Sequence, residues 1–155
     1  MPFLTEPAEA NAYWPDHAAL LLESYLHWIQ RDLLFSATPA HALYHAPFGV
    51  LSHDTVADPR FTYANLAAQT QFEMPWSEIV GLPSRLSAEP LAQAERESLL
   101  ARVASQGYID DYSGVRIARS GKRFTIQNAT VWNLINQDGV ALGQAACFNV
   151  IQLKT

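Results

Sequence analysis

Histidine and aspartate are the side chains of this chain that could carry out acid–base or metal chemistry. The five histidines all lie in the first third of the sequence: His17, His27, His41, His45 and His53. A spacing of four puts His41 and His45 on one face of a helix, as two zinc ligands can be. Prolines flank the pair and no third ligand is obvious, so the pattern favours a surface connection over a metal site.

Asp110 and Asp111 are the carboxylate pair that an acid–base enzyme could use. Neighbours on a strand point to opposite faces, so both can line one site only if the strand bulges. The sequence contains no Gly-x-Ser-x-Gly elbow, Walker phosphate loop or dinucleotide fingerprint, which disfavours an enzyme. The enzyme that remains as an alternative is an isomerase or dehydratase with Asp110 as the base in an apolar pocket.

Turn signals indicate the elements that position these side chains. Ser-Gly-Lys at 120–122 and Asn-Gln-Asp-Gly at 136–139 divide the last third into three β-rich runs, which predicts an antiparallel meander. Before it we expect a helix after the N-cap Asp16, a connection over 36–47, strands over 48–53 and 60–64, short helices over 65–72 and 76–80, and a long helix over 89–106 ended by Gly107. This order defines an α+β fold.

Length and composition indicate a single domain. The 155 residues are 49% hydrophobic, and we expect an N-terminal arm over 1–16 and one domain over 17–155. A net charge of −5 gives no basic field for a phosphate backbone, so no nucleic-acid partner is expected. The longest apolar run, 18–22, is too short to span a bilayer and no leader precedes it, so we expect a cytoplasmic protein with no membrane partner.

Strand alternation predicts a pocket. One face of the run 123–134 carries large, mostly apolar side chains: Phe124, Ile126, Asn128, Thr130 and Trp132. On the preceding run the inward set is Tyr108, Asp110, Tyr112 and Arg116, provided that no bulge occurs at Gly114. Such a face forms either a ligand cavity with a few polar groups or a packed core in which Arg116 pairs with Asp110.

Residues before the meander complete the candidate site. Asn65 is expected to cap its helix, and Arg85 is either an anion clamp or a structural tie between its loop and a helix end. The candidate ligand-binding residues are Tyr63, Arg85, Tyr108, Tyr112, Arg116, Ile126, Asn128, Thr130 and Trp132. The only cysteine, Cys147, lies on the last strand, where buried cysteines behave as small hydrophobes.

Several short motifs occur in an order that resembles a PAS domain: Phe61-Thr-Tyr-Ala-Asn, Ile79-Val-Gly-Leu-Pro, Ser120-Gly-Lys-Arg-Phe and Asn136-Gln-Asp-Gly. Others carry a closer resemblance: Leu51-Ser-His-Asp, Ala57-Asp-Pro-Arg-Phe, Leu82-Pro-Ser-Arg-Leu-Ser-Ala-Glu-Pro, Gly107-Tyr-Ile-Asp-Asp-Tyr-Ser-Gly-Val-Arg-Ile, Ala129-Thr-Val-Trp-Asn-Leu and Gly143-Gln-Ala-Ala. Together these are similar to the MEKHLA family, a PAS-like group, over residues 17–150. The hexapeptide that names the family is absent.

The resemblance implies a PAS-like five-stranded antiparallel sheet with flanking helices, here with an extra N-terminal amphipathic helix. It implies a sensory or regulatory domain that binds a small, largely apolar or aromatic ligand, a protein partner, or both. Flavin photosensors of this class carry a reactive cysteine on a central helix, and haem sensors an axial histidine on the long helix. This chain has neither at those places, so the cofactor is left open.

The N-terminal helix supplies a second functional hypothesis. Its apolar stripe consists of Leu21, Leu22, Tyr25, Leu26 and Ile29. Such a stripe would cover the chain's own sheet or form a homodimer; we expect the homodimer, with a monomer as the alternative. A pure dimerisation module is the third functional class, and it predicts a filled interior without a cavity.

Overall fold

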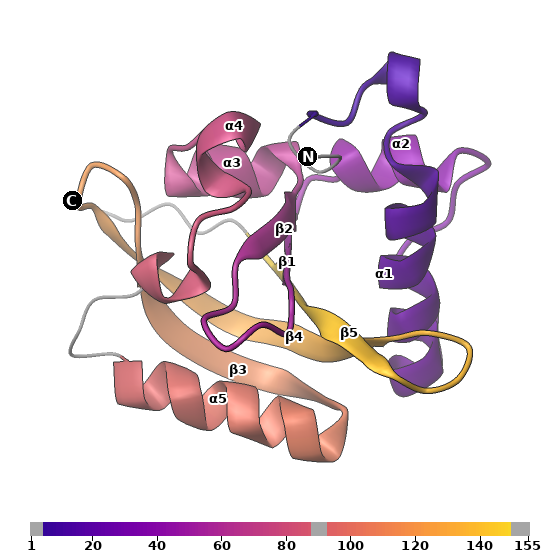
Figure 1. Cartoon of the computed structure of the whole chain (residues 1–155). Helices are drawn as coiled ribbons and strands as arrows, with labels where there is room; N and C mark the ends of the chain where they lie inside the picture. Colours follow the sequence, from indigo (N-terminus) through magenta and orange to yellow (C-terminus); the bar gives the residue numbers. More distant parts are fainter. Residues whose placement is uncertain (1–4, 88–92, 150–155) are drawn as a thin grey trace.

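An antiparallel sheet organises the chain (Figure 1). The computed structural model describes residues 5–87 and 93–149. The sheet is built from β1 (Gly49–His53), β2 (Phe61–Ala64), β3 (Tyr108–Ile117), β4 (Arg123–Ile135) and β5 (Ala141–Phe148), in the order β2-β1-β5-β4-β3. The predicted meander is confirmed: β3 pairs with β4 and β4 with β5. Both turns contain a glycine with positive φ, Gly121 at +89° and Gly139 at +78°, which a side chain would disfavour.

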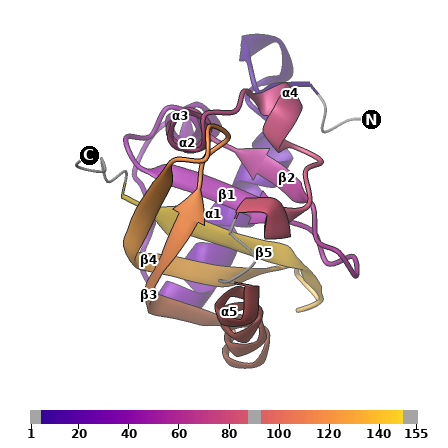
Figure 2. The same ribbon diagram turned by 90° about the vertical axis from the view of Figure 1, so that its left-hand side faces the viewer.

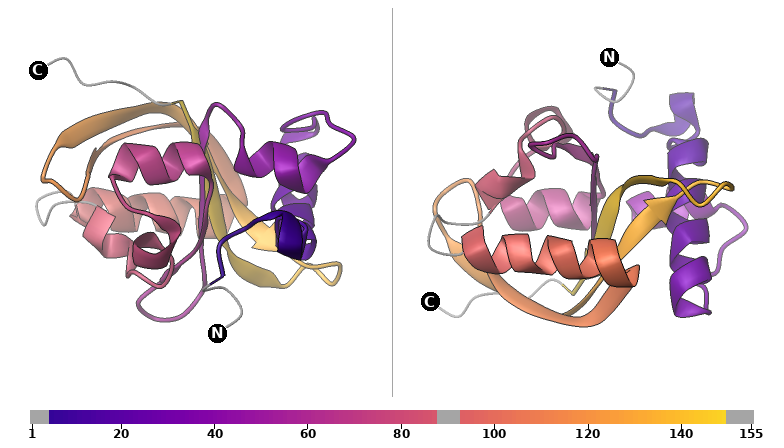
Figure 3. Two further views of the ribbon diagram at one scale, coloured as in Figure 1. Left: turned by 90° about the horizontal axis from the view of Figure 1, so that it is seen from above. Right: turned by 60° about the horizontal axis from the view of Figure 1, so that its bottom comes forward.

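Helices cover both faces of the sheet. They are α1 (Pro15–Ile29), α2 (Pro39–Tyr44), α3 (Leu66–Phe72), α4 (Trp76–Ile79) and α5 (Gln93–Gln106), with 3₁₀ turns η2 (Glu9–Asn11) and η3 (Ser84–Ser87). Two neighbouring residues of β4 identify the faces, because Trp132 packs on α1 while the Asn133 side chain bonds α5. Figures 2 and 3 show α1 and α5 on opposite sides of the strands. None of these helices combines the length and apolarity needed to cross a membrane.

The N-terminal helix begins earlier than expected. We predicted a start after Asp16 with that residue as the cap; the helix begins at Pro15, and Asp16 lies within its first turn. Proline is favoured there because its fixed φ suits a helix and its missing N–H has no helical partner to lose. Asp16 still contributes, since a carboxylate in the first turn interacts favourably with the helix dipole.

Helix α1 folds back onto the sheet of its own chain. Leu21 and Tyr25 are buried, the Tyr25 and Trp132 rings lie 5.0 Å apart, and the Trp132 indole N–H donates to the Leu21 carbonyl at 3.2 Å. The Trp28 indole N–H donates to the carbonyl of Asn133 at 3.0 Å. The inner part of the predicted stripe therefore covers the sheet, and Leu26 at its edge stays 42% exposed.

Two other segments differ from expectation or lie partly outside the described residues. The predicted connection 36–47 contains α2, which begins with Pro39 at its first helical position and buries Leu43 and Tyr44. The predicted start of the long helix at 89 falls outside the described residues. Its predicted end is confirmed: α5 stops at Gln106, and Gly107 follows with φ +93°.

Asn65 ties three backbone segments together through four hydrogen bonds. Its carboxamide oxygen accepts from Val50 N at 2.9 Å and from Ala68 N at 3.1 Å, which confirms the predicted cap of α3. Its amide nitrogen donates to Leu43 O at 3.1 Å and Phe48 O at 2.8 Å. The side chain is fully buried, so water cannot replace any of these bonds. One residue thus holds α2, β1 and α3 in register.

Asn65→Ala should lower the free energy of unfolding by roughly 3 kcal/mol or more, because it leaves several buried backbone groups without partners. Urea denaturation followed by circular dichroism measures this loss. Asn136→Ala is the matched control, since Asn136 also accepts two backbone bonds but in the β4–β5 turn. Water can reach that turn, so the control should lose less than about 1 kcal/mol. Equal losses would contradict the role of Asn65.

Candidate functional site

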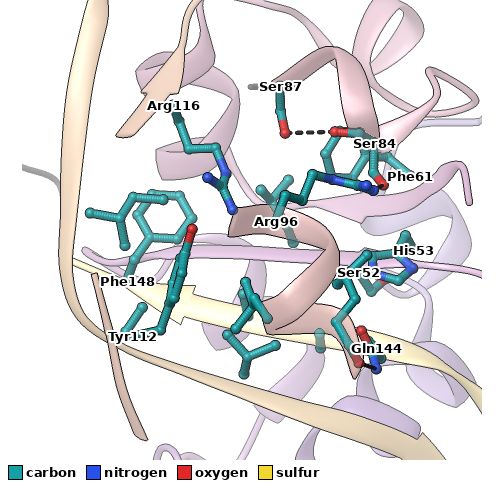
Figure 4. A pocket seen from close by; sticks show the side chains of 18 of the residues that line it. Ser52, His53, Phe61, Ser84, Ser87, Arg96, Tyr112, Arg116, Gln144 and Phe148 are labelled. Atoms are coloured by element: carbon teal, nitrogen blue, oxygen red, sulfur yellow. Dashed lines mark hydrogen bonds between the residues drawn. The ribbon is translucent and has the colours of Figure 1, made fainter. Parts of the chain in front are cut away.

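A cavity of about 80 Å³ lies between helices α3 and α5 and the face of the sheet that α5 covers, with η3 beside them (Figure 4). We call this face the inner face and the face covered by α1 the outer face. Its walls are mainly apolar: Leu51, Phe61, Phe72, Leu99, Leu100, Ile126, Ala129, Val131, Ala145, Ala146 and Phe148. A smaller set is polar: Ser52, His53, Ser84, Ser87, Arg96, Tyr112, Arg116 and Gln144. A mostly apolar space with a few polar groups is the usual composition of a small-molecule site.

Arg96 of α5 is the most unusual of the polar residues. Its side chain crosses the pocket, where Nη2 donates to the hydroxyl of Ser84 in η3, and the residue is only 7% exposed (Figure 4). The hydroxyl of Ser87 in turn donates to the Ser84 carbonyl at 2.7 Å. Burial, and then the nearby charge of Arg116, lowers the pKa of Arg96 from its ordinary value. The site therefore holds a cation in a position that disfavours its charge.

Tyr112 of β3 supplies a hydroxyl with no partner. The residue is 7% exposed and its oxygen bonds no protein atom. Gly114 permits this position, because a β-carbon at Gly114 would collide with the Tyr112 hydroxyl. The Arg116 guanidinium lies 5.3 Å from the centre of the Tyr112 ring, and the two side chains point toward each other in Figure 4. Leaving a buried hydroxyl without a hydrogen-bond partner costs about 1–3 kcal/mol, so a molecule that bonds this group would recover that free energy.

Gln144 and His53 border the opposite part of the cavity. Gln144 Nε2 donates to Asn133 Oδ1 at 3.1 Å and to Leu100 O at 3.3 Å, while its Oε1 has no partner. His53 Nδ1 lies 2.8 Å from the carbonyl of Asp54, and burial lowers the pKa of His53. The lining residues named above include no carboxylate.

Two bulges change the side-chain alternation that the sequence suggested. Ile109 pairs with Val131 and Tyr112 with Ala129, so two β3 residues, Asp110 and Asp111, lie opposite the single Thr130. The next pair, Gly114 with Ile126, leaves two β4 residues opposite one on β3. The extra residue there is Asn128, with φ +52°, and its N–H donates to Ser113 Oγ at 3.4 Å. Each bulge resets the alternation.

The predicted pocket residues are consequently divided between the two faces. Of the nine predicted residues, three line the cavity: Tyr112, Arg116 and Ile126. Trp132 and its partner Tyr108 lie on the face covered by α1. Asn128 and Thr130 line a separate depression of about 170 Å³, which Cys147 also borders. The uninterrupted alternation assumed for 123–134 fails at Asn128, because a residue with left-handed backbone interrupts the pleat.

Asp110 is not among the residues that line the cavity. Both aspartates of the bulge are exposed, and Asp111 Oδ1 lies 3.8 Å from Arg102 Nη2 on α5. The alternative pairing of Asp110 with Arg116 is not formed, since both belong to β3 and Arg116 lies over Tyr112. This geometry offers no support for an aspartate base in an apolar pocket.

Arg85 and Tyr63 also lie away from the cavity. Arg85 Nε contacts Asp58 at 3.3 Å, and the Arg85 carbonyl accepts from Gln93 at 2.8 Å, so this residue ties a loop to the start of α5. Tyr63 of β2 is fully buried, and its ring lies 5.5 Å from His17 and 5.7 Å from Trp76. Burial raises the pKa of Tyr63, whose hydroxyl also has no partner.

Arg96 is the site residue that the sequence reasoning missed, and a signal for it existed. Leu99 and Val103 form the apolar face of α5, and Arg96 precedes them at helical spacing. A cation on an apolar stripe indicates a partner on that side. Ser84, Ser87 and Gln144 have no comparable signal, because their positions depend on how η3 and β5 approach α5.

The lining residues of this cavity include one histidine and no cysteine. In the described part of the chain, no three histidine, cysteine or carboxylate side chains form a metal cluster. The rings of His41 and His45 stack at 4.2 Å, and His45 Nδ1 lies 2.9 Å from the His41 carbonyl. Cys147 borders the other face of the sheet, and burial raises the pKa of its thiol to about 11. A thiol with that pKa is largely un-ionised at neutral pH.

The sheet order, the helices on its inner face and the cavity between them define a PAS fold. A PAS domain of a protein from Colwellia psychrerythraea matches with a TM-score of 0.62 and 15% identity, over 72% of this chain and 92% of that one. A light-oxygen-voltage domain described with a flavin analogue matches at 0.58 and 18%, over 73% and 84%. The PAS domain of a LuxR-family transcriptional regulator from Burkholderia thailandensis, in complex with ethanol, matches at 0.54 and 17%, over 69% and 92%.

Within this fold the sequence identifies a particular family. The MEKHLA domain model matches residues 15–153, which is nearly the whole chain, and the protein belongs to this family. The resemblance inferred from the motifs is thereby confirmed, as is the five-stranded α+β fold. No curated protein matches the sequence.

His17 makes the stability of the fold depend on pH. Its Nε2 lies 3.0 Å from the hydroxyl of Ser52, and burial lowers its pKa from 6.5 to about 4. Below pH 6.5 the unfolded chain takes up a proton that the folded chain does not. The contribution of His17 should therefore lower the free energy of unfolding by roughly 3 kcal/mol as the pH drops from 6.5 to about 4, and this contribution should change no further below that. The lowered pKa of His53 acts in the same direction.

Urea denaturation across this pH range, on the wild type and on His17→Gln, tests the prediction. The variant keeps a hydrogen-bonding group but no longer titrates, so its stability should change less between neutral and acidic pH. Carboxylates contribute equally to both proteins, so the difference between the two curves isolates His17. Parallel curves would contradict the assignment.

Proposed function

We propose that the protein is a sensory or regulatory domain that binds a small, largely apolar ligand in the cavity between the sheet and α5. The unpartnered hydroxyl of Tyr112 on the cavity wall carries this proposal. A filled core would be expected to satisfy such a group, because unpaired buried polar atoms are rare in native proteins. The cavity also favours a binding domain over a pure dimerisation module.

The family and fold support a sensory role without identifying the signal. PAS neighbours include one described in complex with ethanol and one described with a flavin analogue, so this architecture accommodates small molecules of different kinds. Of the predicted ligand-binding residues, Tyr112, Arg116 and Ile126 are those that would contact an occupant of the cavity.

Self-association through α1 is a second proposal, which concerns how a signal would leave the domain. Leu22 and Ala19 of α1 line an apolar groove of about 780 Å³ together with Tyr13 and Pro39, and Leu26 is exposed beside them. A second copy could bury these residues. Leu21 and Tyr25 already pack on the chain's own sheet, so the dimer would use only this outer part of the stripe.

Ala146→Leu should prevent ligand binding. Ala146 pairs with Val131 on the inner face of the sheet, and three added carbons would occupy the small cavity. Native mass spectrometry with an absorption spectrum of the purified wild type should detect a bound molecule that the variant lacks. Ala104→Leu, on the exposed side of α5, is the matched control and should retain it. A bare wild type that also binds no member of a fragment library by ligand-observed NMR would contradict the proposal.

Leu26→Glu should convert a homodimer to a monomer, because it places a charge in the apolar surface that a second copy would bury. Sedimentation-velocity centrifugation of both proteins measures the change. Glu23→Gln, on the same helix, removes a charge without touching the apolar stripe and should leave the dimer intact. A wild type that sediments as a monomer at high concentration would exclude self-association through α1.

A further inference from the structure

The charges around the cavity are unbalanced. The lining residues include two arginines, Arg96 and Arg116, and no aspartate or glutamate. The whole chain carries a net charge of −5, so acidic side chains outnumber basic ones in the chain but not in the lining of the cavity. The two guanidinium groups also lie close enough that the charge of Arg116 contributes to lowering the pKa of Arg96. The lining thus carries two positive charges, and the Glu95 carboxylate lies near Gly114, beside the Tyr112 hydroxyl.

Among the described residues, Arg96 has no ionic partner of the kind that a buried arginine normally has. Its only hydrogen bond in the described part of the chain is to the neutral hydroxyl of Ser84. The acids that influence it act from a distance, since Asp58 is paired with Arg85 and Glu97 is exposed on α5. A guanidinium has five N–H donors in a planar fork, so most of its bonding capacity is free for another molecule.

The Tyr112 hydroxyl is the second polar group aimed into the same region. Like Arg96 it is more than nine-tenths buried, and it has no protein partner. Figure 4 shows it pointing toward the Arg116 guanidinium, from the strand opposite α5. An O–H group and two guanidinium groups together supply donors from both walls of the cavity. An acceptor with negative charge would satisfy all three.

We propose that the ligand is a small organic anion whose oxyanion head group binds Arg96, beside Ser84, Arg116 and the Tyr112 hydroxyl, while its compact apolar body lies between Leu99 and Ile126. This inference rests on the proposed function, because it requires that the cavity binds a ligand. Carboxylates and phosphate monoesters share the chemistry that an arginine fork recognises, through two parallel N–H···O bonds. The apolar body must be small, since the cavity measures about 80 Å³.

Matched probe sets test the head group apart from the body. Each set contains an acid, its neutral amide and the corresponding phosphate monoester with a small apolar body: butyrate, butyramide and propyl phosphate, and likewise isobutyrate, isobutyramide and isopropyl phosphate. Affinities for the purified full chain are measured by ligand-observed NMR. We expect at least one anionic member to bind ten-fold or more tightly than its amide. Which anion is preferred distinguishes a carboxylate ligand from a phosphate ligand.

Arg96→Met should abolish that preference and leave amide binding unchanged, because it removes the charge and keeps an unbranched side chain. Arg85→Gln and Arg102→Gln are the controls, since both arginines are half exposed and bind carboxylates outside the cavity. Both controls should keep the ten-fold preference. Arg96→Met should also be at least as thermostable as the wild type, since it removes a buried charge without an ionic partner. If this variant fails to fold, Arg116→Gln provides the test and should reduce the preference several-fold.

The outcomes separate this inference from the proposed function. Amides that bind as tightly as their anions would overturn the anionic ligand and leave a neutral-ligand domain in place. A preference for anions that survives in Arg96→Met and Arg116→Gln would place the anion elsewhere and overturn the inference as well. If no member of any set binds, while Ala146→Leu is indistinguishable from the wild type in every measurement, the cavity is not a binding site and both proposals fail.

Discussion

The two bulges between β3 and β4 determine which side chains the sheet presents to each of its faces. A strand alternates strictly, so one extra residue exchanges the two faces for every position beyond it. The bulge at Asp110 and Asp111 places Tyr112 on the inner face, and the bulge at Asn128 keeps Ile126 and Ala129 there as well. Without them, the long strands would present different residues to α5 and to α1. The composition of the cavity and the packing of the N-terminal helix both depend on this pair.

The two faces of the sheet consequently perform different tasks. The outer face is closed by aromatic packing, with Trp132 fully buried under Tyr25 and bonded to the backbone of α1. The inner face leaves space, because alanines at 129 and 146 stand where larger residues would fill it. Asn65 holds the short elements above this space in register through four buried bonds. The aromatic packing around Trp132 and the cavity on the opposite face are therefore built on the same strands.

Local signals explain what could be predicted from the sequence. The backbone has positive φ at Gly107, Gly121 and Gly139, a conformation that favours glycine. Each of these glycines lies at a turn or helix end that the sequence predicted. The cap at Asn65 depends on its own helix and was equally predictable. The bulge at Asn128 was not predictable from the sequence. Asparagine adopts left-handed backbone conformations in many contexts, and here only the pairing of β3 with β4 requires that conformation. The partners of Arg96 likewise come from segments distant in sequence, although its place on an apolar helix face was visible.

Asn133 belongs to both layers. Its side chain donates to Val103 O of α5 and its N–H to Gly107 O, while its carbonyl accepts the indole N–H of Trp28 on α1. Asn133 thus links both helices that enclose the sheet through its own hydrogen bonds. Movement of α5 on the cavity side would shift the residue whose carbonyl holds Trp28 of α1 on the far side. This strand is therefore a wall that both helices share.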